Sequence, residues 1–227
     1  NRIQLTHGIA DGILEDLGKA GALHHNVGPL TTVVYYDEVA LGRWIEQKIS
    51  DAGITVVLGA VLREARREGG RLQRLELATR YGDVHVDARG YVDASGDAAL
   101  AWLAGLDCRE PDVPIFGTQM FVLEHLDEAH LPTREAFTKR IKEKAAQYGI
   151  SRDDGLFFRF PGRGVAAMNM THMETPLDPL AASATALAGR EQVDRVIEFL
   201  KAEYPQAFRA PCIRAYALPG IRQPRWT

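Results

Sequence analysis

Residues 84–101 read VHVDARGYVDASGDAALA, and this stretch decides the expected fold. Apolar and polar residues alternate over residues 84–89, as in a strand with one wet face, and residues 91–92 are both apolar, as in a strand covered on both faces. Asp-Ala-Ser-Gly-Asp follows at residues 93–97, before a run of small residues typical of a helix. Since Gly96 has no Cβ and a helix start offers free N–H groups, the backbone here can approach a nucleotide. The alternative is an ordinary strand-turn-helix corner.

The residues upstream of this stretch predict a helix and a three-stranded meander. Apolar residues at helical spacing indicate a helix over residues 38–52, with Asp37 at its start and Gly53 at its end. An apolar strand is expected at residues 54–58. A turn at residues 68–70, a strand over 71–80 and a turn at 81–83 then lead into the strand that begins at residue 84.

The residues downstream predict a second region of mixed structure. Two prolines near residues 111–114 indicate a linker. The elements expected after it are a strand at 118–123, a helix at 133–148, a hairpin of strands 157–160 and 165–170, and a helix at 181–202. This order indicates helices packed against a mixed sheet.

The order of these elements resembles the middle of FAD-dependent oxidoreductases of the glutathione-reductase type, in which an Asp-Ala-Thr-Gly-Asp segment closes the flavin domain. Four further segments resemble parts of that family, and together they extend the resemblance over nearly the whole chain. They are residues 8–14, 36–38, 190–193 and 220–225.

The resemblance implies an α/β fold with an α+β substrate region. Residues 1–106 would form a partial FAD-binding domain, made of the β-meander and the buried strand. Residues 107–216 would form a mixed-sheet substrate domain, and residues 217–227 would begin the return to the FAD-binding domain. The implied cofactor is FAD, with Ser95, Gly96 and Asp97 as cofactor-binding residues. Asp97 would accept a hydrogen bond from a ribose or a water, or would simply cap the helix that begins near residue 98.

Two departures from the family pattern bear on activity. No segment before Gly8 resembles the Gly-x-Gly-x-x-Gly turn that cradles the FAD pyrophosphate. The sequence also begins at Asn1 and stops at Thr227, where the family would return to its flavin domain. We therefore expect an internal fragment that carries part of a flavin site and is inactive alone.

Two arginines near the end of the sequence are candidate contacts of the substrate or the flavin. Arg222 and Arg225 lie in the segment Gly-Ile-Arg-Gln-Pro-Arg. Planar guanidinium groups suit carboxylates, so either residue would place a positive charge near an anionic substrate or the reduced flavin. The simpler interpretation, which the pattern favours, is two exposed arginines in a frayed tail.

A second glycine motif offers a rival nucleotide site. Residues 162–167 match Gly-x-Gly-x-x-Ala after a strand-like segment. A dinucleotide fingerprint needs a helix next and a carboxylate at the end of a second strand, and neither is visible. We interpret Gly162 and Gly164 as a hairpin turn, with an NAD-dependent enzyme as the alternative.

Composition excludes several classes of function. The chain has 227 residues, 46% of them hydrophobic, and a net charge of -3, without a basic stripe or a long apolar run. Neither a nucleic-acid partner nor a membrane span is expected. The two cysteines fit a reducing cytoplasm. His172 and Glu174 are two residues apart but lack a visible third ligand, so no metal site is expected.

The predicted function is hydride transfer between a small-molecule substrate and FAD. The cofactor supplies the redox chemistry in such enzymes, and the protein positions it. The sequence assigns no catalytic acid or base, and it leaves the substrate and the oligomeric state open. The rival from another class is a non-catalytic binding or interaction domain with the same layering.

Overall fold

The computed structural model describes residues 4, 6–28, 31–110, 112–113, 115–176, 178–220 and 225. The chain forms two compact units, and each unit is built from separate stretches of sequence. The first unit comprises Asn1–Ile54, Thr118–Met173 and Ala186–Gly220, and the second comprises Thr55–Gly117, Glu174–Thr185 and Ile221–Thr227. The expected functional division at residues 106/107 and 216/217 stays a prediction.

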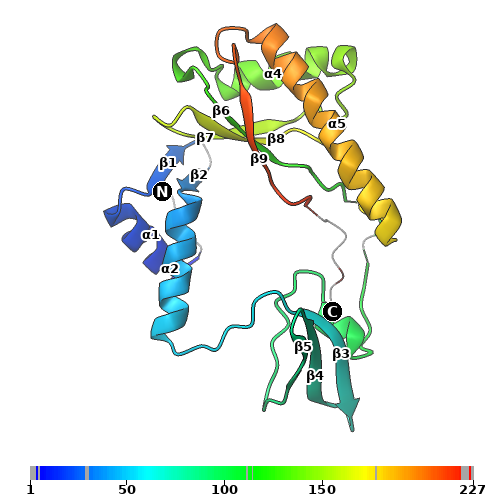
Figure 1. The fold of residues 1–227 in the computed structure, drawn as a ribbon. Coiled ribbons are helices and arrows are strands. Elements are labelled where there is room, and N and C mark those ends of the chain that lie inside the picture. Colours follow the sequence, from blue (N-terminus) through cyan, green and yellow to red (C-terminus); the bar gives the residue numbers. More distant parts are fainter. Residues whose placement is uncertain are drawn as a thin grey trace. The chain divides into compact units, whose positions relative to one another are not determined.

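The first unit contains a four-stranded antiparallel sheet in the order β7-β8-β6-β9 (Figure 1). Its strands are β6 (Phe121–Glu124), β7 (Leu156–Phe160), β8 (Val165–Asn169) and β9 (Cys212–Tyr216). The predicted hairpin is confirmed as β7 and β8, joined by the turn that contains Gly162. The edge strand β9 was not expected, because its alternation is short and partly exposed.

Two helices pack against this sheet and close the main core. They are α4 (Arg134–Lys144), continued by the 3₁₀ turn η2 (Ala145–Tyr148), and α5 (Pro179–Glu203). The predicted capping of α4 is confirmed, since the Thr133 hydroxyl accepts a hydrogen bond from Ala136 N, and Gly149 ends η2 at φ 63°. Fully buried side chains from both layers form the core, among them Phe121, Leu123, Phe137, Ile141, Met168, Val196 and Phe199.

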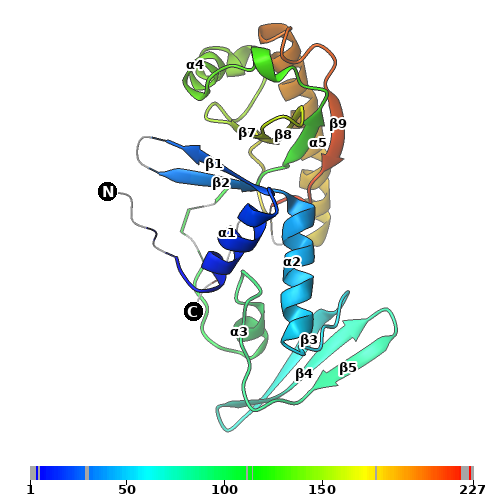
Figure 2. The same ribbon diagram turned by 90° about the vertical axis from the view of Figure 1, so that its left-hand side faces the viewer.

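The N-terminal part of the first unit places a two-stranded ribbon beside β7 (Figure 2). Its elements are α1 (Ile9–Lys19), β1 (Leu23–Val27), β2 (Thr32–Tyr36) and α2 (Glu38–Asp51). The helix predicted over residues 38–52 is confirmed as α2, and Asp37 caps it by accepting from Val39 N and Ala40 N at 2.9 Å. The β1–β2 hairpin is an additional element that the sequence interpretation lacked.

The second unit is a three-stranded antiparallel meander with a short helix packed on it. Its elements are β3 (Val61–Glu68), β4 (Arg71–Thr79), β5 (Gly82–Val86) and α3 (Ala99–Leu103). Ala65, Leu100 and Ala104 form the small core between helix and sheet. The strand expected at residues 54–58 is wrong: this stretch pairs with no described strand, Leu58 is 86% exposed, and the meander begins at β3 instead.

The buried strand expected at residues 91–92 is also wrong. Residues 87–98 form no strand, and Val92 is 90% exposed. A parallel strand is stable only between hydrogen-bonded neighbours, and no described strand pairs with this stretch. The Tyr91 hydroxyl secures the loop instead, because it accepts from Ala88 N at 3.0 Å and donates to Gln73 O at 2.9 Å. Among the described residues, all ladders are antiparallel.

No helix in the described part of the chain has the length and apolar character needed to cross a bilayer.

Candidate functional site

The segment Asp93–Asp97, here called the corner, is organised by the carboxylate of Asp93. Its Oδ1 accepts from the Ser95 N–H at 3.0 Å and from the Ser95 hydroxyl at 2.6 Å, and its Oδ2 accepts from Ala101 N at 3.1 Å. The Ser95 hydroxyl in turn accepts from Ala99 N at 2.9 Å. These bonds, led by the one from the Ser95 hydroxyl, hold the pKa of Asp93 below its usual value. The corner is therefore a fixed turn that precedes α3.

Gly96 lies at the exposed point of the corner and adopts a conformation suited to glycine. Its φ is 87°, and no described atom lies within 4 Å of the position that a Cβ would occupy. Ala98 also has a positive φ, of 54°. Within the described chain, the N–H groups of Gly96, Asp97 and Ala98 have no hydrogen-bond acceptor. The turn thus presents backbone donors and space to a ligand.

Asp97 and Arg225, both predicted as site residues, lie together in the second unit. Arg225 Nη2 donates to Asp97 Oδ2 at 3.0 Å, and its Nε donates to the Asp97 carbonyl at 3.2 Å. The guanidinium also lies over the Trp102 ring, 4.8 Å from its centroid. The interpretation of Arg225 as an exposed arginine is therefore wrong, because its side chain is only 20% exposed. Arg222 lies outside the described residues.

Asp97 does not cap α3, contrary to one of the two roles considered for it. Ala98 is the residue that precedes the helix, and it makes no side-chain cap. At the start of the helix, Ala101 N donates to the Asp93 carboxylate and Ala99 N donates to the Ser95 hydroxyl. The Asp97 carboxylate pairs with Arg225 instead. The sequence interpretation missed Asp93 as the organising residue, although the Asp-x-Ser spacing is typical of such a turn.

The corner offers room and backbone donors to one end of a ligand. Backbone N–H donors at an exposed glycine suit a phosphate or ribose oxygen, while the adjacent Arg225 guanidinium is already paired with the Asp97 carboxylate. Only a few backbone donors are free here, which is fewer than a complete phosphate cradle needs.

In the rival glycine motif at residues 162–167, the glycine N–H groups already have an acceptor. Gly162 N and Gly164 N donate to the carboxylate of Glu128 at 3.0 and 2.6 Å. Burial raises the pKa of Glu128, but these N–H groups outweigh burial and hold that pKa below its usual value. Arg163 is bonded to Asp37. The turn is the predicted hairpin connection, and its donors are already used.

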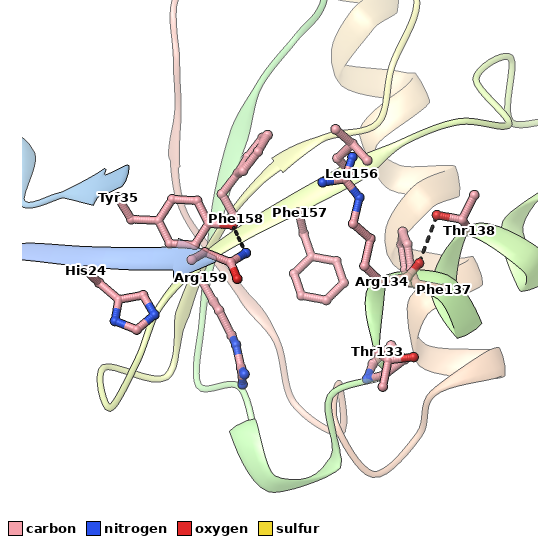
Figure 3. Close-up of a pocket in the computed structure, with 12 residues that line it drawn as sticks. His24, Tyr35, Thr133, Arg134, Phe137, Thr138, Leu156, Phe157, Phe158 and Arg159 are labelled. Carbon is pink, nitrogen blue, oxygen red and sulfur yellow. Dashed lines mark hydrogen bonds between the residues drawn. The ribbon is translucent and has the colours of Figure 1, made fainter. Parts of the chain in front are cut away.

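The second candidate site is a cavity of about 240 Å³ in the first unit, which the sequence did not indicate (Figure 3). It lies among the β1–β2 hairpin, the start of α4 and β7. Arg134 and Arg159 are the charged side chains that line it, next to aromatic rings. The available signal was the run of β-branched and aromatic residues at 32–36 after a glycine, which is typical of a hairpin strand.

No group of three metal-ligating side chains occurs among the described residues. His172 is partly buried, and burial lowers its pKa, while its backbone exchanges hydrogen bonds with the Gln192 side chain at 3.2 and 2.8 Å. The expectation that His172 and Glu174 form no metal site stays a prediction.

The sequence model of FAD dependent oxidoreductases matches residues 1–226. The chain belongs to this family of FAD dependent oxidoreductases. No curated protein and no solved structure showed a significant match.

Proposed function

We propose that this protein transfers a hydride between a small-molecule substrate and FAD, and that the corner contributes one segment of the FAD site. The observation that carries the proposal is the exposed backbone at Gly96. Its neighbourhood is open and its N–H group has no acceptor in the described chain. Membership of the family supplies the cofactor class, and the corner supplies a place for it.

Three residues of the corner would contact the cofactor. Ser95 and Gly96 would contact the cofactor through the backbone of the turn. Asp97 would contribute its N–H group and a carboxylate that is held by Arg225. When bound, FAD supplies the redox chemistry of the hydride. The residues of this chain orient one end of the cofactor, and the Asp93 hydrogen bonds keep the turn in place before the cofactor arrives.

The remaining parts of the proposal concern subtype, partners and location. We place the protein with glutathione-reductase-type flavoproteins, because the meander and corner follow that order along the chain. Residues 107–216 would serve the substrate. Both cysteines are free thiols, which supports a reducing location such as the cytoplasm. Residues 1–227 contain no complete Gly-x-Gly-x-x-Gly unit, so tight FAD binding by them alone is not expected.

The visible absorbance spectrum tests the proposed function. The protein purified at its natural full length is expected to carry the absorbance bands of oxidised flavin, which disappear on anaerobic reduction. A colourless protein that also fails to take up added FAD would contradict the proposal and favour the rival interaction domain.

A further inference from the structure

The cavity of about 240 Å³ in the first unit is formed by three elements that are distant in sequence (Figure 3). The β1–β2 hairpin contributes His24 and Tyr35, α4 contributes Arg134, and β7 contributes Phe157 and Arg159. Its volume is below the roughly 300 Å³ at which pockets for drug-sized ligands begin. A whole dinucleotide is too large for it, whereas a small organic molecule has suitable dimensions.

Aromatic rings give the cavity an apolar wall. Phe157 meets Phe137 edge to face with ring centroids 5.0 Å apart, and Phe158 meets Tyr35 in the same manner at 6.0 Å. Phe137 is fully buried, so this wall is anchored in the core of the unit. Rings held in this way offer a rigid surface to an apolar or aromatic ligand body.

Two guanidinium groups add positive charge to this wall. Figure 3 shows Arg134 and Arg159 on either side of the Phe157 ring. No carboxylate of the described residues lies within ion-pair distance of either group, although Arg159 acts on Glu128 at longer range. The first turn of α4 lies at the cavity as well, with Thr133 and Arg134 among the lining residues. The helix dipole makes this end of α4 electropositive.

We propose that this cavity binds a small organic acid, whose apolar or aromatic body contacts Phe157 and whose carboxylate pairs with Arg134 or Arg159. Guanidinium groups bind carboxylates through charge-assisted, often bidentate hydrogen bonds, and the exposed arginine side chains are free to turn toward a ligand. The inference goes beyond the proposed function, because the acid site does not depend on flavin binding.

Calorimetric titration with phenylacetate tests the inference, with neutral 2-phenylacetamide as the matched probe. The purified protein is titrated at low ionic strength, where charge pairing is least screened. Phenylacetate is expected to bind at least about tenfold more tightly than the amide, and added salt is expected to reduce this preference. Equal affinity for the two probes, or no binding of phenylacetate, would overturn the proposal, whatever the flavin content of the protein.

Variants locate the site. R134Q or R159Q is expected to weaken phenylacetate binding by about tenfold, since a charged hydrogen bond is lost. The matched control is R214Q, which removes an exposed arginine of β9 that does not line the cavity. The proposal fails if R134Q and R159Q both bind as the wild type does, or if R214Q weakens binding as much as they do. Circular dichroism confirms that each variant is folded.

Discussion

The corner at Asp93–Asp97 and the hairpin turn at Gly162–Gly164 are both turns built on glycine, and they differ in whether their N–H groups already have an acceptor. Both contain a glycine with positive φ near N–H groups that can bind an anion. In the hairpin turn, the carboxylate of Glu128 already accepts from both glycines. In the corner, the N–H groups of Gly96 and Asp97 have no acceptor among the described residues. A glycine motif therefore indicates a ligand only where its donors remain free.

The largest expected effect comes from adding a side chain to each turn. G164V is expected to lower the free energy of unfolding by about 3 kcal/mol, because valine is strained at φ 60° and its Cβ would lie 3.3 Å from the Leu126 carbonyl oxygen. G96V is expected to cost about 1 to 2 kcal/mol, since only backbone strain applies where the surroundings are open. Urea unfolding measures both. Equal losses would show that the two turns do not differ in packing.

Removal of the organising carboxylate has the next largest effect. D93A is expected to lower the free energy of unfolding by about 2 kcal/mol, because it leaves the Ser95 and Ala101 donors without their acceptor. D97A is the matched control, and its partly exposed pair with Arg225 is expected to contribute less than about 1 kcal/mol. If D97A proved the more damaging in urea unfolding, Asp93 would not organise the corner.

The hairpin turn has its own acceptor, and E128Q tests it. Glutamine keeps one acceptor oxygen but not the charge, so the expected loss is about 1 kcal/mol. Hydrogen exchange of the Gly162 and Gly164 amides is expected to accelerate, while exchange at the corner stays unchanged. Unaltered exchange at both glycines would mean that Glu128 does not protect them.

The smallest effect is a dependence of stability on pH. The pKa of Asp93 is lowered in the folded protein, so its contribution is complete above the unfolded value near pH 3.9 and is lost as the pH falls through the folded pKa. The difference in unfolding free energy between wild type and D93N is therefore expected to shrink between about pH 5 and pH 2. A difference that stayed constant over this range would exclude the carboxylate charge as its source.

Local signals in the sequence were sufficient for most helices and turns. Asp37 and Gly53 marked the ends of α2, Thr133 marked the start of α4, and Gly149 marked the end of η2, which continues it, because capping depends on residues adjacent to the helix. The Gly162 turn was predicted as a hairpin for a similar reason. The resemblance to FAD-dependent oxidoreductases, inferred from the order of elements, agrees with the family match over residues 1–226.

The contacts between residues distant in sequence could not be predicted from the sequence. The apolar residues at 91–92 matched a buried strand, but a strand also needs neighbours, and the described chain offers none there. The bond between Asp97 and Arg225 joins residues 128 positions apart, and no local pattern indicates such a contact. The cavity beside Phe157 likewise depends on the β1–β2 hairpin meeting β7, an arrangement that appears only in three dimensions.

The dissociation constant of FAD, measured on the full-length protein for G96V and G69V, tests the central claim most directly. Gly69 is a matched position, because it also lies in the second unit at positive φ in open surroundings but outside the corner. If the corner contacts FAD, G96V weakens FAD binding by at least about tenfold and G69V leaves it within about twofold of wild type. Wild-type affinity in G96V, or an equal loss in both variants, would contradict a cofactor contact at Gly96.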